Sequence, residues 1–147
     1  MDVYPVTLGP LTLQANRNWV FAHTRQALMA RRTTQQGMLR IDVTALPDGG
    51  ADDAEVLLKA AEKALFKSPP PPPIDVRPPF PGMRVRGSAS YELRQNGQHF
   101  FSRLWYLAGK DHLLVAIYGC PWAQRDSGDV QEELSECDRM VITARLG

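Results

Sequence analysis

Apolar and polar residues alternate along two stretches that flank a tight-turn signal. Residues 83–93 and 98–107 lie on either side of Asn96-Gly97, the dipeptide most typical of a two-residue hairpin turn. Such a turn places Gln95 opposite Gln98 and thereby fixes the register of every later pair. The pattern therefore predicts an antiparallel hairpin.

A third strand is predicted directly after this hairpin. A turn at residues 109–111 leads into residues 112–120, where both faces are apolar: Leu113, Val115 and Ile117 on one, Leu114, Ala116 and Tyr118 on the other. Strands that are apolar on both faces lie inside a sheet that is covered on two sides. Residues 83–93 are polar on one side, so we expect them nearer the rim of the sheet.

The first half of the chain carries three more strand patterns and one helix pattern. Strands are predicted over residues 11–14, 28–34 and 38–45, and the last of them alternates well, with Leu39, Ile41, Val43 and Ala45 on one face and Arg40, Asp42 and Thr44 on the other. Apolar residues at helical spacing predict an amphipathic helix over residues 53–66, with Asp52 as N-cap and Glu55 as its capping-box partner.

A second amphipathic helix is predicted at the carboxyl end of the chain. Its apolar stripe consists of Val130, Leu134, Cys137 and Val141. Asp129 and Glu132 form a candidate capping box at its start. We interpret Glu132, Glu133 and Glu136 as part of a solvated acidic face, which is the usual place for carboxylates on such a helix.

Eight of the twelve prolines lie between residues 69 and 81, five of them in an unbroken run over residues 69–73. Such a run favours an extended polyproline helix, which has no backbone donors and cannot join a sheet. We interpret residues 68–82 as a semi-rigid connector. The alternative is a ligand for a proline-recognition domain, although the run lacks the closely spaced basic residues that specify such ligands.

The elements follow one another as strands, helix, connector, three-stranded meander and helix. This order predicts an α+β fold, an antiparallel β-sheet of about six strands flanked by helices, in a single domain that spans residues 1–147. A chain of 147 residues that is 44% apolar can bury one core without disulfides or metals. Cys120 and Cys137 are therefore expected to be small buried residues in a reducing compartment.

The amino terminus has no basic segment followed by an apolar one, and no stretch approaches the roughly 18 apolar residues of a membrane span. We therefore expect a soluble, cytoplasmic protein without a membrane partner.

The formal net charge of +1 hides a segregated distribution. Residues 74–110 carry six basic side chains against two carboxylates, whereas residues 111–147 carry seven carboxylates against three arginines. The near-neutral total is unlike that of a dedicated nucleic-acid binder. The arginines assigned to the less apolar face of the sheet are Arg40, Arg84, Arg86, Arg94 and Arg103; they form either a surface for an acidic or aromatic partner or an ordinary solvated face.

The sequence offers no catalytic constellation. His23, His99 and His112 are scattered, without the spacing that holds a metal ion. Gly49-Gly50 precedes a helix but lacks the lysine and the spacing of a phosphate-binding loop. We therefore expect no catalytic residue, no metal and no cofactor, and predict that the protein is not an enzyme.

Large apolar side chains on the arginine-bearing face provide a candidate contact surface. They are core residues if a helix covers them, and a partner-binding patch if none does. Trp122, just after the last strand, is a candidate anchor at the rim of this surface. The predicted binding residues are Arg94, Arg103, Trp105, Leu114, Tyr118 and Trp122.

Three segments carry a family resemblance: the opening residues 4–13 followed by the lone Trp19, the strand LRIDVTALPDG before a helix, and RLWYLAGKDHLLVAIYGCP before an acidic amphipathic helix. In these segments the chain resembles the PsbP-like α/β/α sandwich superfamily, in particular the bacterial DcrB-like proteins. The resemblance implies a non-enzymatic scaffold or binder, as in a photosystem accessory subunit, a nuclear-import factor that binds a small GTPase, and chaperones of type VI secretion effectors. It carries over no catalytic or binding residue.

The leading hypothesis is a cytoplasmic protein-binding module, a chaperone or adaptor for a secreted type VI effector. A second hypothesis is an immunity protein, whose acidic helix over residues 126–138 would contact a basic toxin. The alternative from another class is an enzyme or small-ligand-binding domain, with a cavity between sheet and helix lined by Tyr91, Tyr106 and Cys120. None of the three involves nucleic acid, and each is compatible with a homodimer.

Overall fold

The computed structural model describes residues 3–24, 27–33, 37–47, 53–77 and 86–146. Within these residues, ten strands form two antiparallel sheets, and two α-helices and one short 3-10 helix accompany them. The α+β class predicted from the sequence is confirmed, and the strands outnumber the six that the patterns indicated.

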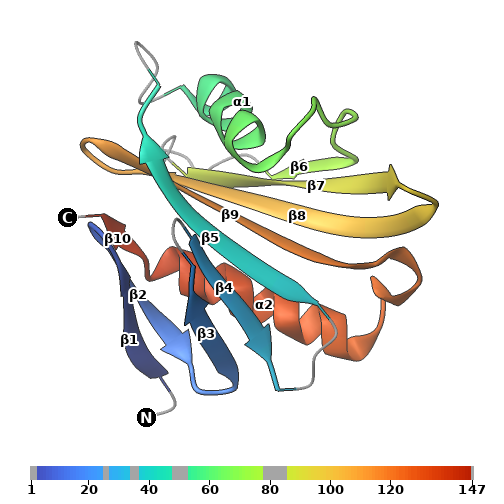
Figure 1. Cartoon of the computed structure of the whole chain (residues 1–147), viewed down its shortest axis with the longest axis horizontal. Coiled ribbons are helices and arrows are strands. Elements are labelled where there is room, and N and C mark those ends of the chain that lie inside the picture. Colours follow the sequence, from blue (N-terminus) through green and yellow to red (C-terminus); the bar gives the residue numbers. More distant parts are fainter. Residues whose placement is uncertain (1–2, 25–26, 34–36, 48–52, 78–85, 147) are drawn as a thin grey trace.

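The larger sheet has the strand order β3-β4-β5-β9-β8-β7-β6, and the smaller one the order β1-β2-β10 (Figure 1). The larger sheet contains β3 (Trp19–His23), β4 (Ala27–Arg32), β5 (Met38–Ala45), β6 (Asp75–Arg77), β7 (Arg86–Gln95), β8 (Gln98–Ala108) and β9 (His112–Pro121). The smaller sheet contains β1 (Val3–Leu8), β2 (Leu11–Asn16) and β10 (Arg145–Leu146). The helices are α1 (Ala54–Leu65), the 3-10 turn η1 (Trp122–Gln124) and α2 (Gly128–Ile142).

The hairpin of β7 and β8 has the predicted turn and register. Asn96 and Gly97 both have positive φ angles, 53° and 77°, as a type I′ turn requires. Gln95 pairs with Gln98, and the register continues to Arg86 opposite Leu107. Residues 83–85 of the predicted strand lie outside the described residues.

Four strands were not indicated by the sequence patterns: β1, β3, β6 and β10. β1 contains Pro5 and lies at an edge of its sheet, and the other three have five residues or fewer. Short or proline-containing edge strands offer too few alternating positions to be distinguished from loops. Two of them, β3 and β6, form the two edges of the larger sheet.

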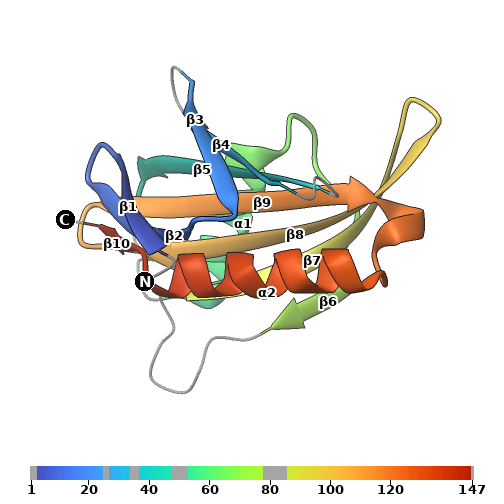
Figure 2. The same cartoon turned by 90° about the horizontal axis from the view of Figure 1, so that it is seen from below.

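α1 and α2 cover opposite faces of the larger sheet (Figures 1 and 2). On one face, α1 buries Leu57 and Ala61 against β7, β8 and β9. On the other, α2 and the β1-β2 hairpin close over a larger cluster that includes Trp19 and Leu39. The central strand β9 is therefore packed on both faces, as its two apolar faces predicted.

The N-cap of α1 is Asp53 rather than the predicted Asp52, which lies outside the described residues. The Oδ1 atom of Asp53 accepts hydrogen bonds from the backbone N–H groups of Glu55 (3.0 Å) and Val56 (3.3 Å). These bonds satisfy two of the donors that a helix leaves free in its first turn.

Replacing Asp53 with alanine is expected to lower the free energy of unfolding by about 1 kcal/mol, because both backbone donors lose their acceptor. Asp53→Ser, which keeps a capping oxygen, should retain most of the stability. Urea titrations of the three proteins measure the difference. Equal stability of the alanine variant and the wild type would show that this cap does not contribute.

The predicted capping box at the start of α2 is not formed. Ser127 is the N-cap, and its Oγ atom accepts a hydrogen bond from the backbone N–H of Val130 (3.2 Å). Asp129 lies in the first turn, where a negative charge is favoured by the helix dipole. Glu132 reaches across to Arg32 instead of back to the cap.

Candidate functional site

The contact surface predicted from the sequence is covered by α2. Trp105, Leu114 and Tyr118 are each at most 4% exposed and belong to the core between the larger sheet and α2. The indole Nε1 of Trp105 donates a hydrogen bond to Asp138 on α2 (2.6 Å). These three residues are therefore core, and the prediction that they form a contact surface is corrected.

The other three predicted binding residues lie around the edge of this core. Arg103 is half-buried and donates from Nε to the Ser90 hydroxyl (3.0 Å). Burial lowers the pKa of Arg103, and the charge of Arg77 lowers it further. The Arg94 side chain is 74% exposed.

Trp122 is held by stacking on both a histidine and an arginine. Its ring stacks on His99, with centroids 4.7 Å apart, and the Arg125 guanidinium lies 3.9 Å from its ring centroid. His99 in turn contacts the Glu92 carboxylate at 2.7 Å. This stack fastens the segment before α2 to the β7-β8 hairpin.

The predicted arginine face is divided between the two sides of the sheet. Arg40 pairs with Ile117 in the β5-β9 register and lies on the α1 side, whereas Arg94 and Arg103 lie on the α2 side. Arg86 shares the α2 side and donates to the Ile142 carbonyl (3.4 Å). Arg84 lies outside the described residues.

Two of the α2 carboxylates predicted to be solvated are buried. Glu133 is 0% and Glu136 6% exposed. Glu136 lies 3.0 Å from Nε of Arg32, and the exposed Glu132 lies 2.6 Å from Nη2 of the same guanidinium. Burial lowers the pKa of Arg32, but the hydrogen bond to Glu132 and the charge of Glu136 outweigh this effect and leave the pKa raised.

Glu133 connects α2 to the sheet through two further groups. It accepts hydrogen bonds from the Tyr118 hydroxyl (2.9 Å) and from the Gly37 backbone N–H (3.1 Å). Burial and the nearby Glu133 charge raise the pKa of Tyr118. The polar groups beneath α2 thus pair with one another and fix the position of the helix on the sheet.

The cavity predicted from Tyr91, Tyr106 and Cys120 is not assembled by the structure. Tyr91 and Tyr106 pack beneath α1, whereas Cys120 lies in the core on the opposite face. The Tyr91 hydroxyl donates to Glu62 (2.6 Å), and burial together with this bond raises the pKa of Tyr91. The three side chains therefore do not line a common site.

Both cysteines are free and buried. Burial, with a contribution from the Glu133 charge, raises the pKa of Cys120 to about 11, and burial raises that of Cys137 well above its usual value. At pH 8 the thiolate fraction of Cys120 is then about a hundredfold smaller than that of an ordinary thiol.

We expect both native thiols to react with a maleimide at least about a hundredfold more slowly than in urea, because the reactive thiolate is scarce and shielded. A Ser135→Cys variant, at an exposed position of α2, supplies the fast control. Mass spectrometry of quenched time points measures each rate. Labelling of Cys120 as fast as the introduced thiol would contradict its burial.

The side of the larger sheet that bears α1 is only partly covered by the described residues. α1 packs on β7, β8 and β9, while β3, β4 and β5 carry a groove on the same side. The groove is lined by Val20, Ala22, Met29, Arg31, Arg32, Thr33 and Met38. Val20 is 64% exposed and contributes apolar surface to the groove beside Met29 and Met38.

A hollow continues this groove across β9 and β8. Met38 lines both, and the hollow adds Gly37, Leu93, Phe100, Ser102, Gly119, Cys120 and Pro121. There is room for a side chain at Gly119. An added Cβ would come no closer than 3.5 Å to another described atom, the Ser102 hydroxyl oxygen. The groove and the hollow together are called the open face.

The open face is apolar in its floor and basic at its edge. Arg31 is exposed, and the partly exposed Arg40 pairs with Asp42 at 3.1 Å. In the part of the chain that the structure describes, no three metal-ligating side chains gather into a cluster. Likewise, no helix there combines the length and apolarity that a membrane crossing requires.

No protein-family model matches the chain, and no curated protein is detectably similar to it in sequence. Solved structures do share its fold. A protein of Bacteroides thetaiotaomicron is 11% identical with a TM-score of 0.60, over 100% of this chain and 49% of its own. The chain therefore spans about half the length of that protein.

LpqN of Mycobacterium tuberculosis, which is involved in cell envelope biogenesis, is 11% identical with a TM-score of 0.57, over 97% of this chain and 88% of LpqN. A PsbP protein of the cyanobacterium Synechocystis is 10% identical with a TM-score of 0.44, over 99% of this chain and 91% of its own. The chain thus shares the fold of the first two structures, and it has helices on both faces of an antiparallel sheet, as the sequence predicted. At these identities the similarity concerns the fold.

Proposed function

We propose that this chain is a non-catalytic protein-binding module and that the open face is its contact surface. The observation that carries the proposal is the exposed apolar groove over β3, β4 and β5, on the side of the sheet where α1 packs on β7, β8 and β9. Exposed apolar surface of this kind, rimmed by polar side chains, marks sites of protein interaction.

The dimensions of the groove suit one helix of a partner. Neighbouring strands lie about 4.8 Å apart, so the strip from β3 to β9 is roughly 14 Å wide. A helix with its side chains is about 10–12 Å across. A partner helix would lie in the layer that α1 occupies on the other half of the sheet, with apolar residues on Met29 and Met38.

The rim of the groove favours a partner segment that carries carboxylates. Arg31 is exposed beside the apolar floor, and its guanidinium is suited to carboxylate recognition. An apolar helix with an acidic flank is the kind of segment that a chaperone or adaptor shields before export. We therefore propose a cytoplasmic chaperone or adaptor for a secreted effector as the specific role.

The immunity hypothesis receives less support from the structure. It relied on the carboxylates of residues 126–138, but Glu133 and Glu136 are buried, and Glu132 and Asp138 are engaged by Arg32 and by Trp105. Rescue of host growth by co-expression with a neighbouring toxin would be the specific sign of that role.

The test compares partner capture by two charge variants on the two edge strands of one sheet. Val20→Glu places a charge on the open face, and Val76→Glu places one on β6 at the opposite edge, where the wild-type valine is 49% exposed. Each tagged protein is used to capture partners from cells of the source organism, with quantitative mass spectrometry as the readout.

The proposal predicts a protein that is captured by wild type and Val76→Glu and lost with Val20→Glu. Co-expression of that protein with wild type, but not with Val20→Glu, should raise its soluble fraction if the role is that of a chaperone. Equal capture of every partner by all three proteins would overturn the open face as contact surface.

A further inference from the structure

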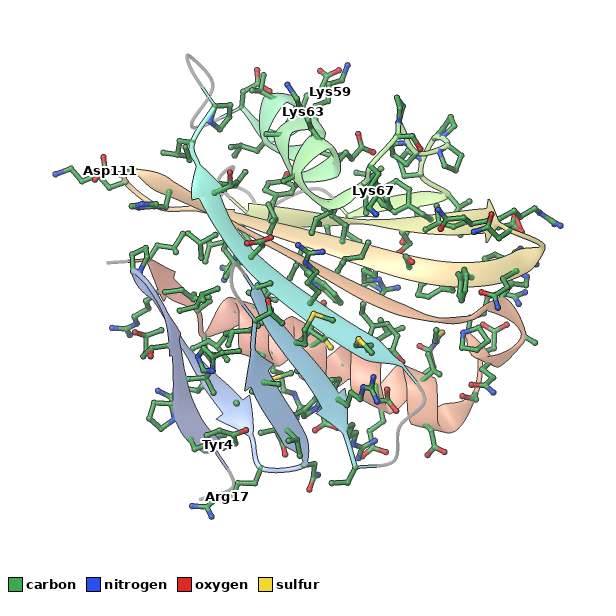
Figure 3. All side chains as sticks on the ribbon, viewed as in Figure 1. Tyr4, Arg17, Lys59, Lys63, Lys67 and Asp111 are labelled. Carbon is green, nitrogen blue, oxygen red and sulfur yellow. The ribbon has the colours of Figure 1, made fainter. Side chains whose placement is uncertain are left out.

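Residues 67–74 connect α1 to β6 and are exposed over most of their length. Figure 1 shows this segment as a loop beside α1, and Figure 3 shows Lys67 near the point where the loop leaves the helix. Each of residues 68–72 precedes a proline, which disfavours helical backbone angles, and the prolines fix their own φ angle. These constraints favour the polyproline II conformation over residues 69–73, between bends at residues 67–68 and at residue 74.

The exposure of the run follows the three-residue period of that helix. Pro70 and Pro73 are half-buried, whereas Pro69, Pro71 and Pro72 are exposed. One edge of the helix thus faces the protein and the other two face solvent. The run also borders a groove with residues 92–95 of β7, to which Ser68, Pro69, Pro70 and Pro71 all contribute. The difference between Pro70 and its neighbours therefore rests on exposure.

Both ends of the run are anchored to the folded body. On the N-terminal side, the Phe66 N–H donates to the Glu62 carbonyl (2.9 Å), and the Phe66 ring packs on Tyr91 at a centroid distance of 5.3 Å. On the C-terminal side, the Ile74 N–H donates to the Ser90 carbonyl (2.8 Å). The run is therefore presented in a fixed orientation rather than as a free tail.

We propose that residues 68–72 form a docking ridge for a partner domain that binds x-Pro-x-x-Pro ligands in an aromatic-lined groove. Such grooves take up two x-Pro dipeptides, separated by one residue that points away. Ser68-Pro69 and Pro71-Pro72 are the two exposed dipeptides, and the intervening Pro70 is the residue turned inward. The two dipeptides that such a groove would take up are therefore the two that are exposed in this protein.

The docking ridge and the adjacent Lys67 indicate which side chains the partner groove should contain. The ridge offers apolar rings and backbone carbonyls, which suit parallel tyrosine and tryptophan side chains with a donor between them. The sequence interpretation overlooked Lys67, which lies two residues before Pro69. Lys67 is exposed and favours a carboxylate at the corresponding end of the partner groove. Because proline fixes the conformation beforehand, little entropy is lost on binding.

The test uses a purified SH3 domain, chosen from a panel because it binds the synthetic peptide of residues 66–75. Its affinity for that peptide and for the folded protein is measured by fluorescence anisotropy. We expect the folded protein to bind at least as tightly as the peptide. Pro69→Ala and Pro72→Ala should each weaken binding by about tenfold or more, because each empties one of the two pockets.

Pro70→Ala is the matched control, because it removes one proline from the same run at the inward position. It should change the affinity by less than about threefold. The proposal is overturned if no domain of the panel binds the peptide, or if the peptide binds and the folded protein does not. It is also overturned if Pro70→Ala weakens binding as much as Pro72→Ala does.

Discussion

Replacing Arg32 with alanine is expected to lower the free energy of unfolding by about 3–5 kcal/mol. Arg32 is 7% exposed and pairs with two carboxylates of α2, at 3.0 Å from Glu136 and 2.6 Å from Glu132. Without it, the 6%-exposed Glu136 would be a buried charge lacking a partner. Most of the expected loss of stability comes from the uncompensated charge of Glu136, and less of it from the net contribution of the Arg32–Glu136 ion pair.

Two variants separate this explanation from a general effect of mutation. Glu132 is 60% exposed, so Glu132→Gln should cost no more than about 1 kcal/mol. The double variant Arg32→Met with Glu136→Leu removes both charges and should recover most of the stability lost in Arg32→Ala. Chemical denaturation monitored by circular dichroism measures all three. An Arg32→Ala protein as stable as the wild type would contradict the account of how α2 is held.

Replacing Trp105 with alanine is expected to cost about 3–5 kcal/mol of stability, the usual range for removing a buried aromatic side chain. Trp105 is 4% exposed, packs between β8 and α2, and donates its indole N–H to Asp138. The substitution leaves a cavity and removes one hydrogen bond of Asp138, which keeps its ion pair with Arg77 at 3.7 Å. If Trp105 were a contact residue instead, the change would weaken partner binding and leave stability nearly untouched.

Arg94→Ala is the control for this prediction. Arg94 was assigned to the same contact surface by sequence, but its side chain is 74% exposed. We expect its removal to change the free energy of unfolding by no more than about 0.5 kcal/mol. Thermal denaturation of the two variants distinguishes a core residue from a surface residue. If Arg94→Ala were destabilised and Trp105→Ala were not, the assignment of Trp105 to the core and Arg94 to the surface would be wrong.

The sequence predicted those parts of the fold that depend on local signals. Asn96-Gly97 fixed the β7-β8 register over ten pairs, because a two-residue turn admits only one alignment. The two apolar faces of residues 112–120 correctly indicated a central strand. Edge strands such as β3 and β6 carry weaker signals, so their number and their place in the sheet were not predictable.

The burial of particular carboxylates depends on partners that are distant in sequence. Glu132 and Arg32 are separated by 100 positions, and nothing near either residue indicates that they meet. On pattern alone, Glu133 and Glu136 are typical of a solvated helix face. Their burial becomes intelligible only when β4 and α2 are seen on the same side of the sheet.

The open face was missed for a related reason. Val20 and Ala22 belong to β3, which the patterns did not indicate, and Met29 and Met38 lie on strands whose other face is core. The sequence shows that β5 has two different faces, but it does not show which face a helix covers. α1 packs mainly on β7, β8 and β9, so the uncovered side is a consequence of where one helix packs.

The most direct test of the central claim is site-specific photo-crosslinking in living cells of the source organism. A photoreactive amino acid is placed at Val20 or Ala22 on the open face, or at the control positions Val76 and Ile142, which are 49% and 54% exposed elsewhere. We predict a discrete crosslinked protein from Val20 and Ala22 and none from the two controls. No crosslink from the open face, together with a discrete product from Val76 or Ile142, would contradict the proposed function.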